Sequence, residues 1–203
     1  MFAAQIGRWH RGPGYGRVMG RIIYDTAASM NGWIADEDNS LDWLFEVAGA
    51  DDVPEELSPP AAAVMVMGAH TYEWVLGAEE LLEHPEKWQH FHGEVPTFVF
   101  TSRQLPIPAG ADIRLVQGSV ESALPRLRAA AREADIWIAG GGDLAGQFAD
   151  CGALDEIRLS IAPVSLTGGA PLLPRRLGAH RLQLVAASQV GQFVRVTYEV
   201  RGS

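Results

Sequence analysis

The sequence is poor in cysteine, in basic side chains and in long apolar runs, and each shortage excludes a class of protein. Its single cysteine, Cys151, cannot form an internal disulfide framework or a cysteine-based zinc site, and it fits a reducing cytoplasm. The 16 Lys and Arg residues are outnumbered by 25 Asp and Glu, and the net charge of -9 argues against a nucleic-acid-binding protein. No apolar run approaches the roughly 20 residues that a membrane-spanning helix requires. We therefore expect a globular cytoplasmic protein that acts on small molecules and binds neither nucleic acid nor membrane.

The first 18 residues differ in composition from the rest of the chain. They carry Arg8, Arg11 and Arg17, no acidic residue, and several glycines. A secretory signal needs an apolar core of roughly 7–15 residues, which this segment lacks. We expect residues 1–18 to form a flexible N-terminal extension. No linker or internal repeat divides the remainder, and 47% of the chain is hydrophobic, so residues 19–203 are expected to fold as one domain.

Strand-like and helix-like segments alternate along this domain. Strands are predicted at residues 21–28, 63–67, 97–100, 113–116, 135–139, 157–162, 181–187 and 193–200, and helices at 41–48, 71–76, 119–132 and 143–151. This alternation predicts an α/β fold with a mainly parallel mixed central sheet, helices on both faces and a C-terminal antiparallel hairpin. Residues 77–93 are expected to be a polar surface excursion. Its His84, His90 and His92 lack the spacing of metal ligands, so no metal site is expected.

A triple glycine provides the strongest local motif. The strand predicted at 135–139 runs directly into Gly140, Gly141 and Gly142, and a helix follows. Consecutive glycines let the backbone approach a ligand closely, and a helix N-terminus attracts phosphate. The pattern is not the G-x-G-x-x-G dinucleotide motif, and a plain tight turn explains a triple glycine equally well.

Two other strand ends carry residues suited to phosphate. Gly68 to Thr71 lie at a second junction of strand, glycine and helix, and Thr101 to Arg103 follow a third strand. Open parallel sheets bind ligands at the carboxyl ends of their strands, so the three ends should converge on one extended anionic ligand. This arrangement predicts a dinucleotide, and the Arg103 guanidinium suits a 2′-phosphate, which favours NADPH over NADH.

The chain resembles the dihydrofolate reductase-like family, in the branch similar to the C-terminal reductase domain of bacterial riboflavin biosynthesis enzymes. The resemblance lies in six segments that span most of the chain from Arg21 onwards: residues 28–35, 67–73, 101–103, 138–148, 154–156, and Pro163 with 168–172. It implies NADPH as cofactor, direct hydride transfer to a C=N or C=O bond of a ring-like substrate, and a homodimer.

The resemblance also implies roles for individual residues. The expected cofactor contacts are Ala27, Ala28 and Ile34 beside the nicotinamide, Gly68, His70 and Thr71 at the second phosphate contact, Thr101, Ser102 and Arg103 at the adenosine phosphate, and Ala139, Gly140, Gly141, Gly142, Asp143 and Leu144 at the pyrophosphate.

The sequence departs from the family pattern at three positions. Asn31 replaces the acid of the family's Ser-Leu-Asp-Gly turn, and an amide cannot serve as a general acid. Folate reductases carry a helix carboxylate where this chain has Ala48, and the nearest acid is Glu46. Ala69 replaces a basic residue of the second phosphate contact. The candidate catalytic residues are therefore Asn31, Glu46 and Asp36, which belongs to an acidic loop after the first strand.

Several aromatic residues could line a pocket for a flat heterocycle. Trp33, Trp43 and Tyr72 are the expected substrate contacts, with Trp74 close by in the sequence. The leading hypothesis is an NADPH-dependent reductase of a small heterocyclic or conjugated carbonyl compound. The alternatives are the pyrimidine reductase of riboflavin biosynthesis and a non-catalytic dinucleotide-binding protein of the same fold.

Overall fold

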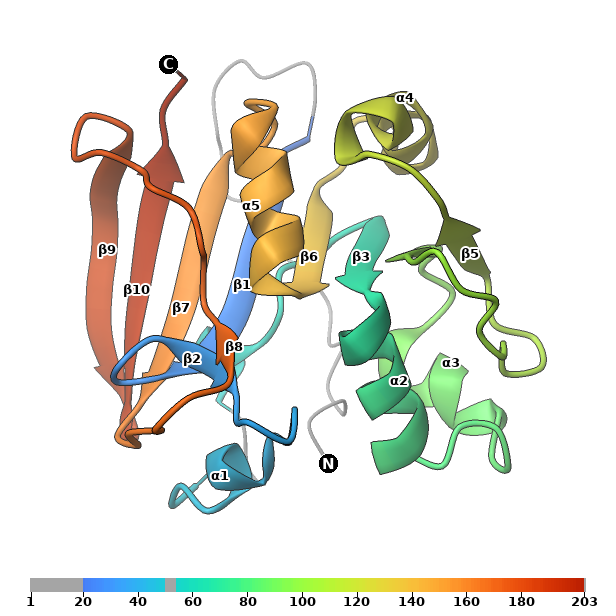
Figure 1. Cartoon of the computed structure of the whole chain (residues 1–203), viewed down its shortest axis with the longest axis horizontal. Coiled ribbons are helices and arrows are strands. Elements are labelled where there is room, and N and C mark those ends of the chain that lie inside the picture. The colour runs from blue at the N-terminus through green and yellow to red at the C-terminus, as the bar shows by residue number, and fades with distance from the viewer. Residues whose placement is uncertain (1–19, 50–53, 203) are drawn as a thin grey trace.

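The computed structural model describes residues 20–49 and 54–202, which form an α/β fold around an eight-stranded sheet (Figure 1). The strand order is β5-β4-β3-β6-β1-β7-β10-β9. The parallel strands are β1 (Ile22–Ser29), β3 (Val64–Gly68), β4 (Thr97–Phe100), β5 (Ile113–Val116), β6 (Ile136–Gly140) and β7 (Glu156–Ala162). The antiparallel hairpin of β9 (Leu182–Val190) and β10 (Phe193–Val200) completes the sheet. The predicted fold class is confirmed, while the extension predicted at residues 1–18 lies outside the described residues.

Both faces of the sheet are covered by helices, as the continuous apolar strands predicted. Val64 and Val66 face one core, which is closed by α4 (Val120–Ala131) and α5 (Gly142–Asp150). Met65 and Met67 point to the opposite face, under α2 (Ala69–Ala78) and α3 (Glu86–His92). Successive strand residues alternate between faces, so the apolar run of β3 supplies both cores.

The segment predicted as a polar excursion is partly built into the core. Helix α3 lies within it, Trp88 is only 1% exposed, and Leu81 is fully buried. His92 packs against Trp88 with 4.4 Å between ring centroids, so this histidine is half-buried rather than on the surface, where it was predicted. Apolar residues are widely spaced among polar ones in this segment, and the periodicity that identifies an amphipathic helix is therefore weak.

Two other segments differ in detail from the prediction. Helix α1 is short (Asp42–Phe45), and a 3₁₀ turn, η1 (Glu55–Leu57), follows later in the chain. The loop predicted after β7 contains β8 (Ala170–Pro171), which pairs with β2 (Trp33–Ala35) in a separate two-stranded sheet. We call residues 168–172 the strap, because they bind this early loop to the start of α5. Of the helices in the described ranges, none is long and apolar enough to cross a membrane.

Candidate active site

The triple-glycine loop and the Gly68 loop meet at the carboxyl edge of the sheet. Strands β3 and β6 are neighbours, and Met67 pairs with Gly140. A Cβ added to Gly140 would lie 2.6 Å from Thr71 Oγ1, and one added to Gly141 would lie 3.8 Å from the Gly68 nitrogen. The two junctions of strand, glycine and helix, at Gly68 and at Gly140 to Gly142, are far apart in the sequence. In the fold they therefore lie next to each other.

Two helices begin at this meeting point. Helix α2 has Gly68 as its N-cap and α5 has Gly141, and no side chain of the described residues caps either helix. The first amides of a helix lack intrahelical partners and carry the positive end of its dipole. Two adjacent helix N-termini without side-chain caps make a strong site for an anion such as a pyrophosphate.

Different structural constraints explain why glycine occurs at the positions around this site. A side chain at Gly140 would overlap Thr71, and one at Gly142 would overlap the carbonyl oxygens of Pro171 and Leu172 in the strap. Gly141 has φ +94°, a backbone conformation that favours glycine. Gly68 alone has an ordinary φ and meets no described atom within 4 Å of an added Cβ. Packing thus explains Gly140 and Gly142, while Gly68 leaves open space at the anion site.

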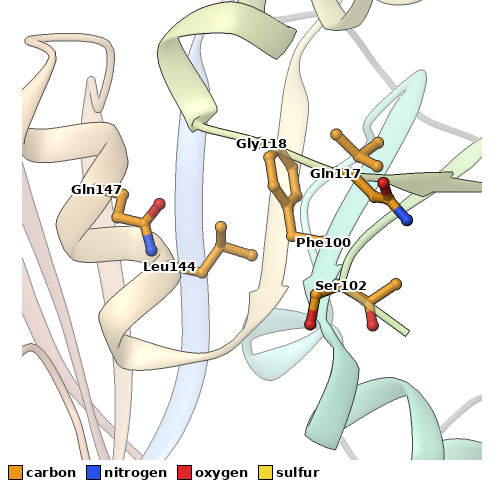
Figure 2. A pocket seen from close by; sticks show the side chains of 8 residues that line it. Phe100, Ser102, Gln117, Gly118, Leu144 and Gln147 are labelled. Atoms are coloured by element: carbon orange, nitrogen blue, oxygen red, sulfur yellow. The ribbon is translucent and has the colours of Figure 1, made fainter.

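A cavity of about 290 Å³ lies beside the start of α5 (Figure 2). It is lined by Phe100, Thr101, Ser102, Val116, Gln117, Gly118, Leu144 and Gln147. Leu144 and Gln147 come from α5, and the other lining residues follow or end strands β4 and β5. Apolar rings and chains with a few amide and hydroxyl groups suit a flat, partly polar ring. The sequence predicted Thr101, Ser102 and Leu144 as site residues but missed Phe100, Val116, Gln117, Gly118 and Gln147.

Arg103 lies on the outer side of this region, where it pairs with α2. Thr101 Oγ1 accepts a hydrogen bond from the Arg103 backbone nitrogen at 3.0 Å, which forms a local turn after β4. Arg103 Nη2 donates to Glu73 Oε2 at 2.7 Å. His70, on the first turn of α2, is exposed. The two basic side chains predicted for the cofactor are thus accessible, but Arg103 already has an acidic partner.

Asp143 at the start of α5 also has local partners. Gln147 Nε2 donates to its Oδ2 at 2.9 Å, and Arg175 Nη2 lies 2.9 Å from its Oδ1. The Gln147 hydrogen bond and then the Arg175 guanidinium lower the pKa of Asp143. Arg175 also pairs with Asp150 at 2.7 Å, so its charge is shared between two carboxylates of one helix.

Asn31 holds the loop after β1 to the segment that follows β7. Asn31 Nδ2 donates to the Leu166 oxygen at 2.7 Å, and its Oδ1 accepts from the Leu166 nitrogen at 3.1 Å and from Ser29 Oγ at 2.9 Å. Met30 N adds a backbone bond to the Val164 oxygen at 2.7 Å. Asn31, predicted as a catalytic residue, therefore uses its amide to fix the loop, although its side chain lies in an exposed position.

The two acidic residues predicted to be catalytic, Asp36 and Glu46, lie in the loop after β2 and at the end of α1. Asp36 Oδ1 accepts from the backbone nitrogens of Asp38 at 2.9 Å and Ser40 at 2.7 Å, so its carboxylate shapes its own loop. Glu46 is exposed at the C-terminal end of α1. Ala27 and Ile34 are half-buried near the end of β1 and on β2, while Ala28 is 1% exposed and offers its backbone rather than its side chain.

Of the three predicted substrate contacts, Tyr72 lies in the core of the structure. Tyr72 is fully buried, because its position on α2 faces the sheet. Its hydroxyl donates to the Pro106 oxygen at 2.7 Å. Trp43 is 6% exposed and packs in a cluster with Ala27 and Phe193. Its Nε1 is the buried side-chain nitrogen that has no hydrogen-bond partner among the described residues. Trp33 is half-buried on β2.

An aromatic contact joins α1 to α2. The Phe45 and Trp74 rings are nearly parallel, with an interplanar angle of 12° and 6.3 Å between centroids. The two helices lie at the same end of the molecule (Figure 1). The sequence placed Trp74 near a flat pocket, but nothing in the sequence paired it with Phe45.

A buried polar cluster on three strands escaped sequence analysis. Arg195 donates to both carboxylate oxygens of Asp25, at 2.8 and 2.6 Å, and to Ser160 Oγ at 3.0 Å. All three residues are at least nine-tenths buried. Burial raises the pKa of Asp25, and the two hydrogen bonds from Arg195 oppose that shift. Asp25 and Ala27 share a strand face by alternation, so the cluster adjoins the side of β1 that packs on Trp43.

The sheet order and the loops at its carboxyl edge are those of the dihydrofolate reductase-like fold. The sequence pattern of the RibD C-terminal domain family matches residues 21–196. The chain therefore belongs to the RibD C-terminal domain family, and it is a reductase of the class that takes its hydride from NADPH.

The chain is also similar to several known proteins. The chain is 28% identical to the uncharacterized protein YwjB of Bacillus subtilis over 177 residues, which cover 87% of this chain and 95% of the relative. It is similar to the structure of a putative riboflavin biosynthesis protein from Shewanella sp. PV-4, with a TM-score of 0.71, 25% identity, and coverage of 90% and 99% of the two chains. Dihydrofolate reductase from Enterococcus faecalis, in a complex with NADP(H), has the same fold at 18% identity, a TM-score of 0.54, and coverage of 90% and 97%.

Proposed function

We propose that this chain binds NADPH across the carboxyl edge of its sheet and reduces a small, flat heterocyclic or conjugated carbonyl compound. The meeting of the α2 and α5 N-termini at Gly68 and Gly141 carries the proposal. It supplies a site for the pyrophosphate, because neither helix has a side-chain cap in the described part of the chain.

The rest of the dinucleotide fits the surroundings of this anion site. The cavity of Figure 2 adjoins the start of α5 and has the size and the mixed lining that an adenine ring needs. In the other direction, Ala27, Ala28 and Ile34 would lie beside the nicotinamide, which supplies the hydride when bound. The protein's part is to hold that ring close to the substrate and to exclude water.

Aromatic residues on the α1 side support a flat substrate. Phe45 and Trp74 present nearly parallel rings from two helices, and Trp43 holds an indole N–H without a described partner beside Ala27. Buried donors normally have a partner, and a substrate carbonyl or ring nitrogen would satisfy this one. We expect the substrate to be an aromatic or conjugated ring that accepts a hydrogen bond.

The pyrimidine reductase step of riboflavin biosynthesis is a second candidate. The similarity to the Shewanella protein favours it. A phosphorylated substrate would need accessible cations on the α1 side, whereas the nearby Arg195 is buried against Asp25. Rescue of a riboflavin-requiring strain by the intact chain would support this step, and failure with a well-folded, NADPH-oxidising protein would exclude it.

Titration of the protein with NADPH tests the cofactor, and its readout is tryptophan quenching and energy transfer to the nicotinamide. Gly68→Ala should weaken NADPH binding by roughly tenfold or more while the protein stays folded, because the added methyl group occupies open space at the anion site. The matched control is Gly77→Ala on the same helix, where an added Cβ also meets no described atom within 4 Å.

The two variants separate a ligand site from a structural turn. Equal NADPH affinity in wild-type protein, Gly68→Ala and Gly77→Ala would refute the pyrophosphate assignment. A folded wild-type protein that binds no NADPH would refute the proposed function as a whole. Oxidation of bound NADPH by members of a panel of pterins, pyrimidines and quinones would then distinguish a reductase from a protein that only binds the dinucleotide.

We also infer a homodimer that forms through the C-terminal hairpin. Seven of the nine residues of edge strand β9 are exposed. Leu184 and Val185 are 56% and 59% exposed on it, and Val194 on β10 is 46% exposed. A long edge strand with exposed apolar side chains readily pairs with another chain.

A further inference from the structure

The Glu73–Arg103 ion pair links the loop that lines the cavity to the helix that begins at the anion site. The bond from Arg103 Nη2 to Glu73 Oε2 is 2.7 Å, and the side chains are 53% and 37% exposed. Arg103 directly follows Thr101 and Ser102, which line the cavity. Glu73 lies on the second turn of α2, whose N-cap is Gly68.

The ion pair with Glu73 reduces the attraction between Arg103 and an anion. A phosphate monoester carries about -1.5 to -2 charges near neutral pH, so it gains from a cation and is repelled by a carboxylate. Ala69 provides no cation at the start of α2, which leaves Arg103 and the exposed His70 as the basic side chains predicted for the cofactor at this site. The Glu73 carboxylate already offsets part of the Arg103 charge, and it stays close by even when a ligand displaces it.

The ion pair itself is easily displaced. Pairs with this degree of exposure contribute little to stability, because solvent screens them and both side chains lose freedom. A bidentate phosphate can therefore take the guanidinium from Glu73. The remaining effect of Glu73 is electrostatic, and it acts on a phosphate but hardly on a neutral hydroxyl.

We propose that Glu73 sets the preference of this site between NADPH and NADH, by weakening the contact of the 2′-phosphate with Arg103 while leaving a free ribose 2′-hydroxyl unaffected. The proposal rests on the proposed function, namely that the chain binds a nicotinamide dinucleotide at this edge. It makes Glu73 a specificity-determining residue that acts through its neighbour.

The test is the ratio of the Kd values for NADPH and NADH, measured by fluorescence titration at low ionic strength. Glu73→Gln should tighten NADPH binding about two- to fivefold and leave NADH binding unchanged, and the gain should shrink in high salt. Arg103→Gln should weaken NADPH binding selectively. In the double variant, Glu73→Gln should bring no further gain, because the cation it offsets is gone.

Asp112→Asn is the matched control. Asp112 forms an exposed ion pair of 2.7 Å with Arg114, and it precedes β5, whereas the cavity lies at the other end of that strand. The control makes the same change in net charge and should leave both Kd values as they are. An equal effect of Asp112→Asn and Glu73→Gln would overturn the proposal, since general electrostatics would then explain both.

Two other outcomes would overturn the proposal, and a third would refute the proposed function instead. Weaker NADPH binding in Glu73→Gln would overturn the proposal, because Glu73 would then serve to orient Arg103 for the phosphate. An unchanged ratio in a variant that still binds both nucleotides would overturn it as well. Wild-type protein that binds neither nucleotide would instead refute the proposed function, and thermal unfolding of each variant identifies any that fail to fold.

Discussion

The charged side chains of Asp25 and Arg195 are nearly removed from solvent, at 6% and 8% exposure. They join β1 to β10, two strands that both pair with β7 but not with each other. A buried ion pair is costly to break, because the remaining charge has no partner. Replacement of both charges by apolar groups of similar volume removes that cost.

A comparison of single and double variants measures this effect. Arg195→Met should lower the free energy of unfolding by about 3–5 kcal/mol, because it leaves the Asp25 carboxylate buried without its partner. Asp25→Leu combined with Arg195→Met should recover most of that loss. Urea denaturation followed by tryptophan fluorescence gives both values. A single-variant loss below about 1 kcal/mol would show that solvent reaches the pair.

His92 links stability to pH. Burial lowers its pKa from an ordinary value of 6.5 to about 4. Below pH 6.5 the unfolded chain binds a proton at this histidine and the folded chain does not, so its contribution to stability is present above pH 6.5 and is lost as the pH falls toward 4. The loss is at most about 3 kcal/mol for a shift of this size.

The wild-type protein and His92→Gln should therefore differ in their pH dependence. The variant should show a smaller fall in unfolding free energy between pH 6.5 and 4, measured by urea denaturation at several pH values. His90→Gln is the control, because His90 is exposed on the same helix. Parallel curves for the wild-type protein and His92→Gln would contradict the assigned burial effect.

At the scale of elements, helix α5 and the strap support the site together. The strap lies against Gly142, and Leu172 N donates to the Gly32 oxygen at 2.9 Å, so the β1–β2 loop, the strap and the start of α5 form one unit. Tyr24 OH adds a bond to the Leu172 oxygen at 2.9 Å from β1. The position of the α5 N-terminus therefore depends on a segment about 30 residues later in the chain.

Gly142→Ala tests this dependence. The added methyl group would overlap the Pro171 and Leu172 carbonyl oxygens, so the variant should lose about 1–3 kcal/mol of stability as the strap or helix shifts. Gly68→Ala should lose little stability, because it meets no described atom. Thermal unfolding of the two variants checks the contrast, and equal melting temperatures would show that the strap yields without cost.

At the scale of the whole molecule, the two edges of the sheet differ. Strand β5 has four residues, whereas β9 has nine and is mostly exposed. Short edge strands resist pairing and long apolar ones favour it. We therefore expect the second copy of the chain to bind at β9 and not at β5.

Sedimentation equilibrium should give about twice the 22.0 kDa chain mass for the wild-type protein. Val185→Asp should shift the protein toward monomer, because it places a charge in the apolar part of the edge strand. Ile107→Asp is the control, since Ile107 is 45% exposed outside the hairpin. A monomeric wild-type protein, or a Val185→Asp variant that remains dimeric, would contradict this interface.

The sequence by itself determined most of the strands of the sheet and the fold class. Apolar runs such as Val64 to Met67 identify buried strands, and glycines after two of them mark the starts of α2 and α5. These signals are local, because a strand end, a turn and a helix start lie within a few residues of one another. They were enough to predict the fold class and the two junctions of strand, glycine and helix.

The tertiary structure decided the contacts between distant residues. It packs Thr71 against Gly140, pairs Glu73 with Arg103, and buries Asp25 with Arg195, 170 positions apart in the chain. It also turns Tyr72 into the core. A helix or strand pattern indicates which residues share a face, but the neighbour that each face meets depends on how the whole sheet is ordered, and that order is set by packing between segments far apart in the sequence.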